Sequence, residues 1–217
     1  MNIEIIIRVN STDAKAYSDV FDKKTYLKHN LLKSGDTWLD LGSHIGCFTI
    51  QAKNLGINVH SYEAEQSNKE YFKKNLGYYP NDGISIKGGS LDLYIAKGLN
   101  TWRHSLLKIR GRQVVSINTL SLDDEIYNKK PDGIKMDIEG YELTILDYLT
   151  FDKLKEWNVK YLIIEYSFDK DKLISNFLNR INKLKLYYKN VIYDSKVNIS
   201  LVEYTFHPQQ CMIYCFN

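Results

Sequence analysis

The sequence has few cysteines, and it lacks both a long apolar run and a strong charge of one sign. Its three cysteines, Cys47, Cys211 and Cys215, form no C-x-x-C pair, and their number is odd. This usage is typical of free thiols in a reducing compartment. No apolar run approaches the length of a membrane span, and residues 1–4 lack the basic start of a signal peptide. We therefore expect a cytoplasmic protein without a membrane-spanning segment.

The balance of charge also limits the kinds of partner. There are 29 Lys and Arg residues against 26 Asp and Glu, and the net charge of +3 is too small to indicate nucleic-acid binding by itself. The hydrophobic content of 44% and the charged content of 25% are typical of a globular protein. No repeat, linker or low-complexity tract divides the 217 residues. We expect one domain over 1–217, with a lead-in over 1–35 and a core over 36–217.

An apolar run followed by two glycines, W-L-D-L-G-S-H-I-G at 38–46, predicts a buried strand, a tight turn and the start of a helix. Glycine lets the backbone approach a ligand closely, and the first turn of a helix has N–H groups to offer. Asp40, two residues before Gly42, suits an ammonium group or a ribose hydroxyl better than a phosphate. The pattern D-x-G-x-x-x-G therefore favours a small, partly cationic cofactor. The alternative is an ordinary βα turn with a capping Asp.

The next strand is predicted at 57–62, and it ends in Glu63 and Ala64. Glu63 follows Asp40 by 23 positions. In doubly wound folds, an acid about 20 residues on, at the end of the next strand, accepts hydrogen bonds from ribose hydroxyls. This spacing predicts a ribose-binding role for Glu63, against the alternative of a solvated loop acid. The helix that follows is expected to begin at the capping box Ser67–Glu70.

A short third strand is predicted at 84–87, followed by two glycines and Ser90. The tip of the third strand lies beside the adenine in this kind of fold, which makes Ser90 a candidate there. A glycine-rich hairpin turn explains the same residues equally well.

The other patterns predict the rest of an α/β fold with a mostly parallel sheet. Strands are expected at 3–9, 113–117, 133–138 and 160–166, helical segments at 12–30, 45–55, from 121, 141–149 and 173–184, and tyrosine-rich strands at 186–193, 199–206 and 211–216.

Residues 97–122 contain five basic residues and no acid. A solvated, mobile face is one interpretation of such a run. The other is a loop that receives an anionic or polyhydroxylated substrate, with Trp102 or Tyr94 offering a flat apolar face. His104 lies in this run and is a candidate catalytic residue, although a lone histidine is more often a surface or packing residue.

A second constellation, K-M-D-I-E-G-Y-E at 135–142, places Asp137, Glu139 and Glu142 at the tip of the fourth strand. Glu165 lies near the carboxyl end of the following strand. Ligands of open α/β sheets bind at these carboxyl ends. Because neighbouring carboxylates raise each other's pKa values and destabilise a fold, such a cluster indicates a site.

Together, L-D-L-G-S-H-I-G, Y-E-A-E-Q-S-N, I-K-M-D-I-E-G-Y-E and L-I-I-E-Y-S resemble the FkbM family of S-adenosylmethionine (SAM)-dependent O-methyltransferases over about residues 38–166. The glycine turn is generic to class I methyltransferases, and the K-x-D-x-E-G-x-E block is the more specific part. The resemblance implies a Rossmann-like class I methyltransferase fold, with a mostly parallel seven-stranded sheet and helices on both faces. It also implies transfer of a methyl group from SAM to a hydroxyl, often on a sugar or a polyketide.

The resemblance also implies roles for individual residues. Asp40, Gly42 and Gly46 would hold the methionine end of SAM, Glu63 the ribose, and Asp137 would lie by the sulfonium and the acceptor, while Glu139 and Glu142 fix the turn. His44 replaces the small or amide residue more usual in this turn. The candidate cofactor-binding residues are Asp40, Gly42, Ser43, His44, Gly46, Glu63, Ala64, Ser90 and Asp137.

Methyl transfer to an alcohol needs a base that takes the hydroxyl proton. The first choice is Asp137, followed by His104, with His44 and Glu165 behind them. Alternatively, Asp137, Glu139 or Glu165 could bind Mg²⁺, which would lower the pKa of the alcohol.

Three other functions share parts of this pattern. A nicotinamide-dependent oxidoreductase would need G-x-G-x-x-G, and Gly42-Ser43-His44 supplies no second glycine at the required place. An RNA methyltransferase would suit the basic run, but its usual D/N-P-P-[YF] signature is missing. A non-catalytic SAM-binding module is the third. We expect a small-molecule or glycan acceptor, for example a deoxysugar such as rhamnose, and no nucleic acid; the sequence predicts no oligomeric state.

Overall fold

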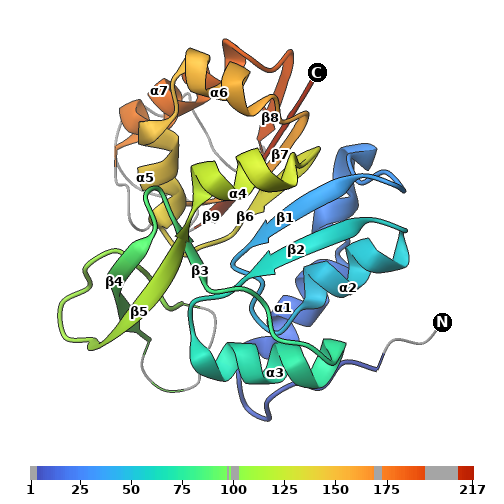
Figure 1. Cartoon of the computed structure of the whole chain (residues 1–217), viewed down its shortest axis with the longest axis vertical. Helices are drawn as coiled ribbons and strands as arrows, with labels where there is room; N and C mark the ends of the chain where they lie inside the picture. The colour runs from blue at the N-terminus through green and yellow to red at the C-terminus, as the bar shows by residue number, and fades with distance from the viewer. Residues whose placement is uncertain (1–3, 97, 99–102, 169–172, 194–209) are drawn as a thin grey trace.

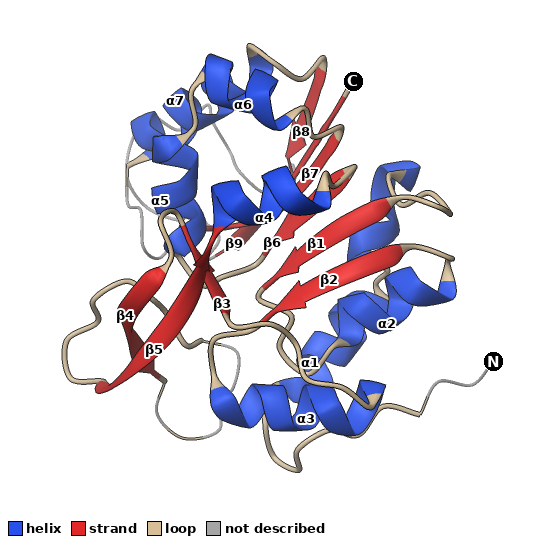
Figure 2. Ribbon diagram, viewed as in Figure 1, coloured by secondary structure: helices blue, strands red, loops and turns tan. Residues whose placement is uncertain are grey.

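The fold of the chain is shown by a computed structural model (Figure 1), which describes residues 4–96, 98, 103–168, 173–193 and 210–217. Helices cover both faces of a six-stranded sheet, and a small three-stranded sheet stands beside it (Figure 2). The predicted α/β class is therefore confirmed. Of the sequence predictions, the strand at 199–206 and the residues Lys97 and Trp102 lie outside the described part of the chain.

The large sheet has a parallel part and an antiparallel part. In spatial order its strands are β2 (Asn58–Tyr62), β1 (Thr37–Leu41), β6 (Gly133–Met136), β7 (Tyr161–Ser167), β9 (Gln210–Phe216) and β8 (Asn190–Tyr193). The first four are parallel, whereas β9 pairs antiparallel with both β7 and β8. All four residues of β6 are buried, as expected for a central strand covered on both faces.

The strand predicted at 84–87 belongs to the small sheet, and among the described residues the large sheet has six strands and not the seven expected. That sheet has the order β3 (Gly83–Ser85), β5 (Gln113–Ser121) and β4 (Gly89–Ile95), with β3 parallel and β4 antiparallel to β5. The large sheet meets this segment through one parallel bridge between Tyr62 and Asn81. The long β5 supplies the backbone partners of β3, and the Ser85 and Thr119 hydroxyls add a 2.8 Å hydrogen bond across the pair.

Each face of the large sheet has its own hydrophobic core. Alternation along β1 sends Leu39 and Leu41 to one core, with residues of β6, β7 and the C-terminal helices, and Trp38 to the other, with α2 and the lead-in. The helices are α1 (Asp13–Tyr17), α2 (Cys47–Asn54), α3 (Gln66–Leu76), α4 (Leu122–Lys129), α5 (Tyr141–Tyr148), α6 (Phe151–Trp157) and α7 (Ile174–Lys185), with a π-helix η1 (Ser18–Asp22) and a 3₁₀ segment η2 (Thr25–Asn30) in the lead-in. By the same alternation Asp40 faces the core of Trp38, beneath α2.

Two local predictions are wrong, and one helix was not predicted. Residues 4–9 form no strand, because Arg8 pairs with Asp13 and the N–H of Ile6 donates to the side chain of Asn75 on α3. The cap of α3 is Glu65 rather than Ser67, since the Glu65 carboxylate accepts the N–H of Asn68 at 2.7 Å. The sequence also missed α6, which begins at a separate Thr150 cap directly after α5.

In the described residues, no helix is both long enough and apolar enough to span a membrane.

Candidate active site

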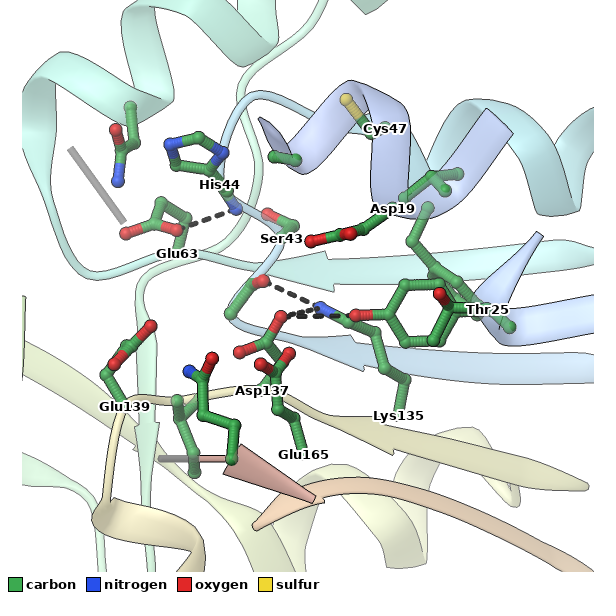
Figure 3. A pocket seen from close by; sticks show the side chains of 18 of the residues that line it. Asp19, Thr25, Ser43, His44, Cys47, Glu63, Lys135, Asp137, Glu139 and Glu165 are labelled. Atoms are coloured by element: carbon green, nitrogen blue, oxygen red, sulfur yellow. Dashed lines mark hydrogen bonds and ion pairs between the residues drawn. The ribbon is translucent and has the colours of Figure 1, made fainter. Parts of the chain in front are cut away.

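A cavity of about 380 Å³ lies at the carboxyl ends of β1, β2, β6 and β7. The turn after β1, the tip of β2 and the tip of β6 all contribute to its wall, and the lead-in closes it (Figure 3). The volume lies in the range of small-molecule sites. Nine of the twelve residues predicted to bind the cofactor or a metal ion or to act in catalysis line it: Gly42, Ser43, His44, Glu63, Ala64, His104, Asp137, Glu139 and Glu165. Three others, Asp40, Gly46 and Ser90, are not in its lining.

The turn after β1 depends on glycine because two strand tips approach closely there. Gly42 has φ +80°, and a Cβ at this position would overlap the carbonyl oxygen of Asp137. The N–H groups of Gly42 and Ser43 both donate to the carbonyl of Tyr62, at 3.0 and 2.9 Å, so they serve the fold. The hydroxyl of Ser43 is different, since the residue is only 3% exposed and its Oγ has no hydrogen-bond partner among the described residues. A ligand in the cavity can supply that partner.

His44 joins this turn to the lead-in. It has φ +51°, a left-handed conformation that is uncommon for a residue with a side chain. Its ring Nε2 lies 3.3 Å from Asp13 Oδ1 and 3.2 Å from the Arg8 guanidinium. Burial alone would raise the pKa of Asp13, but hydrogen bonds from His44 and Arg8 hold it well below its usual value. This charged cluster fixes the lead-in over the turn.

Glu63 is buried at the tip of β2, next to the turn. Its Oε2 accepts the N–H of His44 and its Oε1 accepts the N–H of Glu65, both at 2.8 Å. Burial raises the pKa of Glu63 despite these bonds. Each oxygen keeps a second lone pair for a ligand hydroxyl.

Asp40 lies under the site and not in it. The residue is fully buried, its Oδ2 accepts from the Thr49 hydroxyl at 2.7 Å, and its Oδ1 accepts from Lys135 Nζ at 2.9 Å. Lys135 Nζ also donates to the carbonyl of Gly42 at 2.8 Å. Asp40 can therefore act on a ligand only through Lys135, which does line the cavity.

Lys135 is a site residue that the sequence reasoning missed. Burial works against its charge, but Asp40 and Asp137 raise its pKa, so the ammonium is retained. A signal was available: Lys135 and Asp137 are two apart, and residues two apart share a face of a strand.

Asp137 and Glu165 form a carboxyl pair at the floor of the cavity, and Figure 3 shows them pointing toward one another. Burial, and then the charges of Asp137 and Glu139, raise the pKa of Glu165 well above its usual value. The Tyr26 hydroxyl donates to Asp137 Oδ2 at 3.2 Å, and Lys135 Nζ lies 3.8 Å from the same oxygen. Glu165 thus favours its protonated form, whereas Asp137 is the member of the pair that contacts both Tyr26 and Lys135.

The turn after β6 is fixed from below by Glu142. This buried carboxyl accepts the N–H of Gly140 at 2.8 Å and the N–H of Ser167, at the end of β7, at 3.0 Å. Glu139 has φ +52°, and its carbonyl accepts from the Ser105 hydroxyl at 2.6 Å. The two bonds to Glu142 join the tips of β6 and β7, and so place Asp137 and Glu165 together.

Glu142 should make stability depend on pH. Burial raises the pKa of Glu142 to about 7, from 4.5. Between these values the folded chain holds a proton that the unfolded chain has released, so this contribution is complete below the lower pKa and is lost as the pH rises through the higher one. We expect the free energy of unfolding to fall by about 2 to 3 kcal/mol more in the wild type than in Glu142→Gln between about pH 5 and pH 8. Urea unfolding at both pH values measures this, and parallel pH profiles of the two proteins would contradict it.

His104 lines the cavity, but its hydrogen bond limits its chemistry. Its Nδ1 accepts the N–H of Ala96 at 3.1 Å, and burial lowers the pKa of the ring to about 4. The imidazole is therefore neutral near pH 7, with its proton on Nε2. It can donate a hydrogen bond to a ligand, but in this tautomer it cannot take a proton from one.

Gly46 and Ser90 lie away from the cavity lining. Gly46 is the N-cap of α2, with φ +94°, and it packs against Phe72 and Leu76 of α3. Ser90 is exposed on β4, where its hydroxyl pairs with that of Ser116 at 2.9 Å. Ser90 lies outside the lining because β3 pairs with β5, and the chain that follows β3 continues into the small sheet as β4.

The arrangement does not fit a metal ion. No three His, Cys, Asp or Glu side chains are arranged as ligands of one ion in the part of the chain that the structure describes. The Mg²⁺ alternative at Asp137, Glu139 and Glu165 meets a further obstacle, since the ammonium of Lys135 lies 3.8 Å from Asp137 and Glu165 favours its protonated form.

Among solved structures, fibrillarin in a fibrillarin/Nop5p complex is similar to this chain at a TM-score of 0.52 and 14% identity, covering 92% of this chain and 81% of that one. Fibrillarin of Aeropyrum pernix with natively bound S-adenosyl-L-methionine has a TM-score of 0.44 at 12% identity, covering 95% and 74%. Precorrin-6y C5,15-methyltransferase of Geobacter metallireducens has 0.43 at 15% identity, covering 94% and 87%. At 14% identity, the similarity to the fibrillarin of the Nop5p complex shows a shared fold and nothing about function.

No curated protein sequence matches the chain. The family model described as the methyltransferase FkbM domain matches residues 40–189. This span begins at Asp40 and includes Glu63 and the acidic block at 135–142. That span covers well over half of the 217 residues. The chain therefore belongs to the FkbM methyltransferase family.

Proposed function

We propose that this chain is a SAM-dependent O-methyltransferase that moves a methyl group to a hydroxyl of a small molecule or glycan. One observation carries the proposal: a single cavity holds the glycine turn after β1, Glu63 after β2 and Asp137 after β6. Membership in a methyltransferase family sets aside the nicotinamide-dependent oxidoreductase.

The cavity residues fit SAM. The free lone pairs of Glu63 suit the ribose hydroxyls, and the unpartnered hydroxyl of Ser43 suits the polar part of the donor beyond the ribose. Three apolar side chains line the same cavity and suit the adenine ring: Ile84 on β3, Leu93 on β4 and Leu106 in the connection between β4 and β5. The Nε2–H of His104 is a donor for a ring nitrogen.

SAM supplies an electrophilic methyl group on a sulfonium. The task of the protein is to align the acceptor oxygen with that carbon, an orientation effect worth roughly 7–11 kcal/mol. As the new bond forms, the proton of the acceptor hydroxyl moves to a carboxylate oxygen of Asp137. Tyr26 and Lys135 hold that carboxylate in place. Because Glu165 favours its protonated form, it adds little negative charge beside Asp137 and can donate a hydrogen bond.

Glu63→Gln should raise the Kd of S-adenosylhomocysteine (SAH), the demethylated product, by about 10- to 100-fold. The reason is that a hydrogen bond to a charged group contributes about 1.5–3 kcal/mol, and the amide loses the charge. Isothermal titration calorimetry gives the Kd. Glu70→Gln is the matched control, since Glu70 lies on α3 outside the cavity lining and accepts from the Tyr79 hydroxyl. Equal Kd values for wild type and Glu63→Gln would remove Glu63 from the ribose site.

The acceptor class is tested by a transfer screen with radiolabelled SAM over nucleotide sugars, free glycans, polyketides and RNA. Label on a sugar hydroxyl supports the glycan assignment, which rests on the FkbM resemblance. Label on RNA alone would overturn it in favour of an RNA methyltransferase. Binding of SAH without transfer to any acceptor would favour a non-catalytic SAM-binding module.

A further inference from the structure

The wall of the cavity includes a part of the chain that lies before the FkbM match. Helices α1 and η1, at 13–22, follow one another directly and precede residue 40, where the match begins. They and the residue after them contribute Lys15, Asp19 and Lys23 to the lining. These three recur every four residues, so they share one side of the helical segment. Lys23 Nζ lies 2.6 Å from Asp19 Oδ1, an ion pair at the rim of the cavity.

Two observations favour a polar ligand on this side of the cavity. The first is the buried Ser43 Oγ, which has no hydrogen-bond partner among the described residues. The second is Asp19, whose carboxylate points into the cavity in the direction of Ser43 (Figure 3). In the same view, Ser43 lies between Glu63 and Asp19.

The acid of the glycine motif cannot meet an ammonium group here. Asp40 is fully buried, and its two oxygens already accept from Lys135 and Thr49. A ligand with an ammonium group therefore needs another carboxylate on the far side of Ser43 from the ribose acid. Asp19 is in that position.

We propose that the lead-in binds the amino acid end of SAM, with Asp19 taking its ammonium group and Lys23 its carboxylate. This inference rests on the proposed function. SAM is ordered as adenine, ribose, sulfur and amino acid, so a donor held by its ribose at Glu63 extends its amino acid end past Ser43. That end carries one positive and one negative charge. An Asp–Lys pair four residues apart on one side of a helical segment presents the complementary two charges.

Three ligands that differ in one charged group each test the assignment. SAH has the whole amino acid end, decarboxylated SAH keeps only the ammonium group, and 5′-methylthioadenosine has neither. Asp19→Asn should raise the Kd of SAH and of decarboxylated SAH by about 5- to 20-fold, a discounted value for a partly exposed charge, and leave that of 5′-methylthioadenosine unchanged. Lys23→Gln should raise the Kd of SAH and leave the Kd values of the other two ligands unchanged. The matched control is Asp22→Asn, because Asp22 is exposed on the same π-helix and does not line the cavity.

The outcomes separate this inference from the proposed function. If the wild type binds all three ligands but Asp19→Asn binds SAH as tightly as the wild type, only the role of Asp19 is overturned. If Asp19→Asn raises the Kd of all three ligands equally, Asp19 maintains the shape of the site and does not bind the ammonium group, and the inference also fails. If the wild type binds none of them, the proposed function itself is wrong. Thermal unfolding of each variant confirms that the comparison is made on folded protein.

Discussion

Asp137→Asn should slow methyl transfer by about 10²–10⁴-fold and leave the Kd of SAH within a few-fold of the wild type. An amide has nearly the same shape as the carboxylate but cannot take the acceptor proton, and general-base catalysis is worth about this factor. Single-turnover transfer of labelled methyl groups measures the rate, and calorimetry measures the Kd.

Glu165→Gln is the matched control for this prediction. Since burial and the neighbouring acids raise the pKa of Glu165, the wild-type residue favours its neutral form, and a neutral amide should change the rate much less than Asp137→Asn does. A large loss in Glu165→Gln with little loss in Asp137→Asn would reverse the assignment of the base. Loss of activity in EDTA with rescue by Mg²⁺ would replace the carboxylate base with a metal ion.

Lys135→Met should lower the free energy of unfolding by about 3–5 kcal/mol, because removing one partner leaves the other charge buried and unpaired. The residue is only 3% exposed, and its ammonium donates hydrogen bonds to both the Asp40 carboxylate and the Gly42 carbonyl. Urea unfolding near neutral pH gives the value.

The double variant Asp40→Asn/Lys135→Met tests the reason for that loss. With Asp40 also neutralised, no buried carboxylate is left without its counterion. We therefore expect the double variant to have a higher free energy of unfolding than Lys135→Met. Two outcomes would contradict the account: a loss below about 1 kcal/mol in Lys135→Met, or a double variant whose loss equals the sum of the two single losses.

The sequence predicted those parts of the fold that depend on local pattern. The strand, glycine turn and helix around Gly42, the tip of β2 at Glu63 and the carboxylates after β6 follow from short-range spacing. The rule that parallel strands end at one edge then brings them together. The partner of β3 was beyond this reasoning, because β3 pairs with β5, a strand that begins some 30 residues further on, whereas the segment just before β3 meets β2 through one bridge. Because β3 and β4 both pair with β5, Ser90 lies outside the cavity lining, where the adenine contact was expected.

The sequence predicted which acidic residues gather at the site, but it did not predict which partners those residues contact. An acid in the glycine motif could face a ligand or a core cation, and only the close approach of β1 and β6 shows that Asp40 faces Lys135. The roles of Tyr26 and Asp19 arise from a lead-in whose short α-, π- and 3₁₀-helical turns give no clear period. Such contacts depend on how the lead-in packs against α2 and the sheet, which no spacing in the sequence encodes.

Calorimetric titration of the wild-type chain with SAH tests the central claim most directly, namely that neighbouring strand tips form one binding site for the methyl donor. The experiment is run at two temperatures, because burial of apolar surface makes the binding enthalpy depend on temperature and it can be near zero at one of them. The account predicts saturable binding of one SAH per chain. Absence of heat at both temperatures, with protein shown to be folded, would contradict it.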